Sequence, residues 1–262
     1  MFVDLVFLTA ALSAQPAPEA VPTALEAAPV AVAPSALADE PMNVWTGTVN
    51  IGASYSDGNT DARSVNAAAE AIRRQEKDRW TGKAYWNYGQ QRGGDGEFAL
   101  SQRRAGLSLK YDYFMSKQVY LFGIAGIESD TLADISKRYY VGAGLGYQWR
   151  EDETLKWGSE AGLTYFKTDY KHSDDTDYIA ARLANNVAWK INENTSLENN
   201  IELFPSIESA KDFYGKSDTK VKTNLSKTMF AQLQWIYQYT ARPADGKERN
   251  DNLVVLGVGW SF

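Results

Sequence analysis

From Val44 to the end of the chain, apolar and polar residues alternate with a period of two, and no other feature constrains the fold more. Along 104–113, Ala105, Leu107 and Leu109 alternate with polar or small residues. Such alternation places one set of side chains on each face of a β-strand. Strands are predicted at about 44–56, 63–75, 79–91, 100–114, 119–128, 138–150, 155–167, 178–190, 196–204, 217–226, 229–240 and 251–262.

Each predicted strand is about as long as a tilted bilayer crossing, which takes roughly ten residues. The connections alternate in length. They are short at 76–78, 115–118, 151–154, 191–195 and 226–228, and they are mostly longer and polar at 57–61, 92–97, 129–137, 167–177, 205–216 and 241–250. Short turns at one end and long loops at the other are typical of outer-membrane proteins. The sequence therefore predicts an all-β fold over residues 44–262, an antiparallel up-and-down transmembrane β-barrel of about 12 strands.

The tryptophans favour the barrel over a soluble β-sandwich, whose polar face would be exposed to solvent. Six of the eight indoles lie where predicted strands begin or end on the short-turn side: Trp45, Trp80, Trp149, Trp157, Trp189 and Trp260. A membrane interface collects indoles because they are apolar in body and polar at the N–H group. These six residues are the predicted interface girdle, with Tyr55, Tyr88, Tyr165 and Tyr239 at the opposite level.

The opposite face of the predicted strands carries charges, which are costly inside a barrel unless they pair or meet water. The predicted lumen-lining residues are Glu70, Lys83, Arg104, Lys110, Arg138, Arg150, Glu160, Arg182, Lys190, Glu198 and Glu202, with Arg74, Lys220 and Lys222 on the same face. Two interpretations stay open. The charges form ion pairs that fill a narrow barrel, or they line a water-filled path and set its selectivity. The excess of positive charge favours anionic solutes if a path is open.

Four short segments are distinctive: KDRW at 77–80, YDYF at 111–114, GAGLGYQ at 142–148 and GWSF at 259–262. Together they resemble the bacterial family of salt-induced outer-membrane proteins, a family of unknown function, over about residues 44–262. The resemblance implies a barrel in the bacterial outer membrane and supplies no catalytic residues. The alternation that runs up to Phe262 also resembles the C-terminal assembly signal that the barrel-assembly machinery recognises.

The N-terminal region differs in composition from the predicted barrel. Residues 1–14 resemble a signal peptide, with the apolar run LVFL at 5–8 followed by small residues, although Asp4 and the absence of Lys or Arg depart from the pattern. A disordered soluble N-terminus is the alternative. Residues 15–43 contain six of the eight prolines, which predicts an Ala/Pro-rich disordered periplasmic linker.

Little in the sequence points to catalysis or to a cofactor. The chain has no cysteine, and its one histidine, His172, lies in a polar acidic segment where a solvated side chain is expected. Gly142, Gly144 and Gly146 have the wrong spacing for a phosphate-binding loop, and they predict a strand whose inner face leaves room for bulky side chains. The acidic segments 57–61 and 174–177 lack the distal Glu of a calcium loop. No cofactor and no metal are predicted.

The sequence thus predicts an integral outer-membrane protein that is not an enzyme. A narrow passive channel or an envelope protein of osmotic stress is the first hypothesis. A structural or adhesive barrel without an open pore is the alternative, followed by an outer-membrane enzyme. The expected partners are outer-membrane lipid, the assembly machinery and small solutes or ions. Nucleic acid is not expected, because the net charge is -6.

Overall fold

The computed structural model describes residues 43–56, 62–93, 96–172, 174–209, 213–241 and 249–262. The signal-like segment 1–14, nearly all of the predicted linker and the segment 57–61 lie outside these ranges. The described chain folds into twelve strands: β1 (Trp45–Ser56), β2 (Ala62–Arg74), β3 (Asp78–Arg92), β4 (Phe98–Phe114), β5 (Val119–Asp130), β6 (Ile135–Glu151), β7 (Leu155–Tyr170), β8 (Thr176–Lys190), β9 (Thr195–Pro205), β10 (Phe213–Asn224), β11 (Met229–Thr240) and β12 (Asn250–Ser261).

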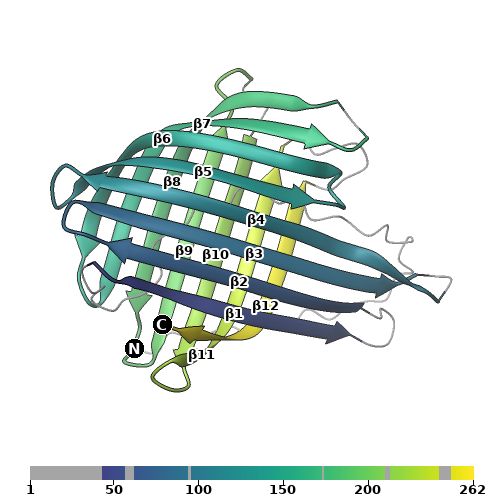
Figure 1. Cartoon of the computed structure of the whole chain (residues 1–262), viewed down its shortest axis with the longest axis horizontal. Helices are drawn as coiled ribbons and strands as arrows, with labels where there is room; N and C mark the ends of the chain where they lie inside the picture. The colour runs from purple at the N-terminus through teal and green to yellow at the C-terminus, as the bar shows by residue number, and fades with distance from the viewer. Residues whose placement is uncertain (1–42, 57–61, 94–95, 173, 210–212, 242–248) are drawn as a thin grey trace, which may run out of the picture.

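The strands form a closed antiparallel barrel in which every strand pairs with its sequence neighbours and β12 pairs with β1. The closing ladder runs from Thr48↔Ser261 to Gly52↔Gly257. In Figure 1 the strands at the front cross those at the back obliquely, as the tilt of a barrel requires. The predicted fold class is confirmed. The described residues include no helix that is both long enough and apolar enough to span a membrane.

Several predicted loops are shorter in the structure because the flanking strands continue into them. The segment expected at 129–137 is reduced to 131–134 between β5 and β6, and β10 begins at Phe213 rather than near 217. The polar side chains there weakened the strand signal. Their backbone groups still pair along the ladders, as Arg138↔Thr168 does between β6 and β7. Paired backbone groups favour continuing a strand whatever the polarity of its side chains.

The two faces of the barrel differ sharply. Aliphatic side chains on the outer face are about half exposed, including Leu107, Val141, Leu145 and Leu163. The inner face carries charged residues together with a buried cluster of Phe114, Tyr120, Phe122, Ile124, Tyr140, Phe166, Ala180, Phe204 and Tyr214. The apolar surface of this molecule therefore faces outward, which is the reverse of the arrangement in a soluble protein.

The glycines of β6 make room for this inner cluster, as the sequence predicted. Gly146 lies opposite Tyr120 and Gly144 lies opposite Phe122 on β5. A Cβ atom at Gly146 would lie 2.1 Å from the Tyr120 ring. The bulky side chains come from the adjacent strand, where the inward-facing Tyr120, Phe122 and Ile124 of β5 each lie opposite a glycine of β6.

Candidate functional site: the barrel interior

Nine of the eleven predicted lumen-lining residues point into the barrel and are buried or nearly so: Glu70, Lys83, Arg104, Lys110, Arg138, Glu160, Arg182, Glu198 and Glu202. They come from β2 to β9, and each occupies one of the alternate strand positions whose side chains point into the barrel. The structure brings them together in three groups of ion pairs.

Arg150 is placed differently from the prediction, and Lys190 lies at the mouth of the interior rather than within it. The β6–β7 ladder shifts register between Gln148 and Arg150, which turns Arg150 out of the inner parity. The Arg150 side chain is 56% exposed and pairs with Asp152 in the following turn. Lys190 keeps the inner parity, but it is the last residue of β8 and lies exposed at the rim. Counting alternate positions along the sequence does not detect a β-bulge, and it does not show at which residue a strand leaves the barrel interior.

The largest group is an alternating series of three cations and three carboxylates, which we call the ion chain: Arg79, Asp112, Lys110, Glu160, Arg182 and Glu202. Lys110 Nζ lies 2.5 Å from Asp112 Oδ1 and 2.6 Å from Glu160 Oε1. Arg182 lies 2.6 Å from Glu160 and 2.7 Å from Glu202. The Tyr120 hydroxyl donates to Glu160 over 2.7 Å. The ion chain and the aromatic cluster fill the part of the interior beneath β3 to β9.

A second group lies on the other side of the interior, under β2, β3, β9 and β10. Lys83 pairs with Glu70 at 2.8 Å, and Lys222 pairs with Glu198 at 2.9 Å. Lys220 lies 3.7 Å from Asp218. The Lys222 and Lys220 side chains are 12% and 18% exposed, compared with 2% for Arg182, so this group meets open space.

A third group lies nearer the longer loops. Arg138 pairs with Glu128 at 3.1 Å, and Arg104 lies 3.7 Å from Asp130. The Tyr85 hydroxyl donates to Glu128 at 3.3 Å.

The buried charged residues that the sequence prediction missed are Arg79, Asp112, Glu128, Asp130, Lys216 and Asp218. Asp112 lies two positions after Lys110 and therefore on the same face of its strand, so the alternation could have identified it. Asp130 and Lys216 fell in segments predicted as loops. These six residues are two cations and four carboxylates, so they offset part of the excess positive charge that the sequence indicated.

Two cavities adjoin the second group. The central cavity, of about 100 Å³, is lined by charged and polar residues such as Asn66, Lys83 and Lys216, together with apolar residues such as Ala84. The mouth cavity, of about 370 Å³, is lined by residues of the short-turn end, including Lys190, Asn192 and Lys227. Both are lined by Thr48, Glu70 and Lys222. Polar space therefore extends from the short-turn end towards the middle of the barrel.

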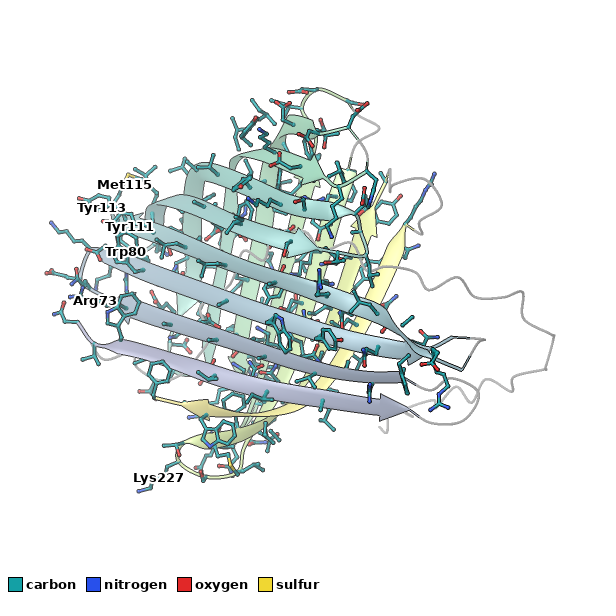
Figure 2. All side chains as sticks on the ribbon, turned by 45° about the vertical axis from the view of Figure 1, so that its right-hand side comes forward. Arg73, Trp80, Tyr111, Tyr113, Met115 and Lys227 are labelled. Carbon is teal, nitrogen blue, oxygen red and sulfur yellow. The ribbon has the colours of Figure 1, made fainter. Side chains whose placement is uncertain are left out.

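The six tryptophans of the predicted girdle all lie within three residues of a strand end on the short-turn side. Five are 41–53% exposed, and Trp80 is half-buried against Tyr111, with ring centroids 4.6 Å apart. Figure 2 shows Trp80, Tyr111 and Tyr113 together at this end of the barrel. Several indole N–H groups have polar partners, such as Trp157, which donates to Asn185 at 2.9 Å. Each such indole keeps an apolar ring outward while its N–H group is satisfied.

Phe262 follows β12 and lies next to Gly47 of β1. The two residues exchange backbone hydrogen bonds of 3.0 Å, and the Phe262 ring leans over the glycine. This residue therefore extends the closing ladder.

His172 lies at the long-loop end, and its side chain is 84% exposed. Its Nδ1 atom lies 2.5 Å from Asp134 Oδ1, and its backbone N–H donates to Asp134 Oδ2. This contact joins the β5–β6 and β7–β8 connections. In the described ranges, no group of three His, Asp or Glu side chains could hold a metal ion.

The His172→Ala variant is expected to raise the pKa of Asp134. The hydrogen bond from the His172 side chain holds the pKa of this carboxyl below its ordinary value. A lowered pKa means that the link contributes above the ordinary value of about 3.9 and is lost as the pH falls through the folded value. Carboxyl NMR titration of the barrel in micelles measures the shift. Asp152, whose pKa Arg150 lowers in another turn, is the internal control and should not move. An unchanged Asp134 titration would show that the contact is absent in solution.

A closed barrel with an aliphatic outer face, an aromatic level at one end and a charged interior has the architecture of outer-membrane porins and channels. A family model for proteins of unknown function, DUF481, matches residues 49–262. The chain belongs to this family. A comparison with curated protein sequences found no match.

Two solved structures share the fold. The NanC porin has a TM-score of 0.51 at 10% identity, with 82% of this chain and 98% of that chain covered. An outer membrane channel from Pseudomonas putida F1 has a TM-score of 0.50 at 10% identity, with 88% and 99% covered. At these identities the likeness concerns the fold alone.

Proposed function

We propose that this protein is an integral β-barrel of the bacterial outer membrane that passes small polar solutes or ions along a narrow interior path. The observation that carries the proposal is the pair of adjoining polar cavities, with Thr48, Glu70 and Lys222 lining both. The role is passive. As the sequence resemblance implies, it serves the envelope under osmotic stress.

The membrane location rests on the outer face. About half-exposed leucines and valines surround the barrel between its ends, and water would disfavour so large an apolar surface. Lipid is the medium that favours it, with the tryptophan girdle at one interface. Export by the signal-like segment and recognition of the last strand by the assembly machinery are further parts of the proposal.

A sealed structural barrel is the second candidate, and a specific observation favours it. The ion chain is fully paired and its members are at most 5% exposed, so this part of the interior excludes water. Any path is therefore confined to the region of the central cavity, which holds only about 100 Å³.

Recordings from purified protein in planar bilayers separate the two candidates. Heat-modifiable migration on a denaturing gel first establishes that the barrel is folded. We expect small, discrete conductance steps. Lys222→Met, which removes a charge that lines both cavities, should shift the selectivity between anions and cations by roughly twofold towards cations.

Lys117→Glu is the matched control, because Lys117 lies in the exposed β4–β5 turn and lines neither cavity. Its selectivity should equal that of the wild type. Folded barrels that give no discrete steps would favour the sealed barrel. Protein that stays soluble without detergent would contradict the membrane location.

A further inference from the structure

Five cations line the central cavity, and four of them have a carboxylate within ion-pair distance. Lys83 has Glu70 at 2.8 Å, and Lys222 has Glu198 at 2.9 Å. Arg104 has Asp130 at 3.7 Å, and Lys220 has Asp218 at 3.7 Å. The fifth cation, Lys216, is in none of the ion pairs formed among the described residues.

Lys216 lies on β10 with its side chain inside the barrel, and the residue is only 3% exposed. The carboxylates nearest to it along the strands are engaged elsewhere. Glu202, its partner in the β9–β10 register, is bonded by Arg182, and Asp218 accepts from Gln234 at 2.8 Å. A buried ammonium group that lies in no direct ion pair is disfavoured, so the site favours an additional anion.

Among the residues that line the same cavity, two acceptor atoms and one donor, Arg104 Nε, lack hydrogen-bond partners. Asn66 Oδ1 and Gln232 Oε1 are buried and accept no hydrogen bond, although Gln232 donates to Gln234 through Nε2. Both residues line the central cavity. Gln232 is paired in register with Lys222, six positions along β10 from Lys216, so a small ligand bound at Lys216 does not reach it. A buried carbonyl oxygen needs a donor, which a bare carboxylate does not supply and a hydroxyl group does.

We propose that the central cavity binds a small, singly charged oxyanion that carries a hydroxyl group, namely a hydroxycarboxylate of about the size of lactate. Its carboxylate pairs with Lys216, and its hydroxyl donates to the amide oxygen of Asn66. One negative charge matches the one cation without a partner, and a cavity of about 100 Å³ limits the ligand to a few heavy atoms. This inference rests on the polar interior of the proposed function, since the solute enters through the mouth cavity.

The test uses the full-length barrel in detergent micelles, with isothermal titration calorimetry of sodium lactate at constant ionic strength. We expect saturable binding of lactate and weaker binding of acetate, which lacks the hydroxyl group. Lys216→Met should weaken the affinity for lactate by about tenfold or more, because one charge-assisted contact is lost. Asn66→Leu should reduce the preference for lactate over acetate. Lys117→Met, in the exposed β4–β5 turn that lines neither cavity, should leave lactate binding unchanged.

The stability of the ligand-free variants gives a second readout. If Lys216 has no counter-charge in the protein, Lys216→Met should unfold at the same temperature as the wild type or higher. A lower unfolding temperature would mean that Lys216 is part of a structural ion pair, and the proposal would fail. It would also fail if wild-type protein and Lys216→Met bound lactate equally or not at all. Lactate binding by a barrel that does not conduct would support this site and refute the channel, whereas conductance without lactate binding would refute only the site.

Discussion

The Arg182→Met variant is expected to lose about 3–5 kcal/mol of stability, the cost of removing one partner from a buried ion network. Arg182 is 2% exposed and bonds both Glu160 and Glu202. Without it, Glu160 keeps Lys110, but Glu202 loses its closest cation in a site that water does not reach. Urea unfolding of the barrel in micelles or liposomes, followed by tryptophan fluorescence, measures the loss.

Two controls separate the loss of this charge from a general defect. Lys222→Met breaks a pair that borders a cavity, with the lysine side chain 12% exposed, so its cost should be smaller than that of Arg182→Met, about 1–3 kcal/mol. Arg182→Met combined with Glu202→Met removes both charges and should recover most of the lost stability. If Arg182→Met unfolded at the wild-type urea concentration, the ion chain would have no part in stabilising the barrel.

Gly144→Ala is expected to destabilise the barrel by roughly 1–3 kcal/mol, and Gly144→Val by more, because both overpack a tight inner surface. A Cβ atom at Gly144 would lie 2.2 Å from the Ala161 carbonyl oxygen and 2.6 Å from the Gly162 Cα atom. Both atoms belong to the backbone of β7, so relief requires shifting the β6–β7 ladder. The Phe122 ring, at 2.8 Å, blocks movement inward.

Gly123→Ala on the adjacent strand is the matched control. Nothing lies within 4 Å of a Cβ atom at this position. Its stability should stay within about 0.5 kcal/mol of the wild type or rise slightly, because alanine loses less backbone entropy on folding. The folded fraction on heat-modifiable gels and the urea midpoint check both variants. Equal stabilities for Gly144→Ala and Gly123→Ala would contradict the packing described for β6.

Much of the barrel was predictable because its two faces meet different media. A strand that crosses a bilayer needs apolar residues at alternate positions. The outward orientation of Leu107 or Leu145 could therefore be predicted without knowing its neighbours in the fold. The tryptophans also indicate the level of the membrane interface, since Trp45 and Trp260 both lie at the short-turn end of the barrel. The interior charges Glu160 and Arg182 followed from the same parity.

The errors fell where this local signal stops. Arg150 was predicted to lie inside the barrel because the bulge after Gln148 does not change the alternation of apolar and polar residues in the sequence. Asp130 and Lys216 were assigned to loops because strands that extend beyond the apolar band no longer alternate in hydropathy.

The sequence by itself determined the architecture: strand number, direction, the outward face and the level of the aromatic girdle. These follow from one-dimensional patterns because solvent or lipid acts on each side chain separately. Only the tertiary structure decided which interior charges pair. Lys110 and Glu160 are fifty positions apart, and their contact depends on the stagger of the closed sheet. The same stagger leaves Lys216 as the cation of the central cavity without a partner among the described residues, and no pattern along the chain carries that information.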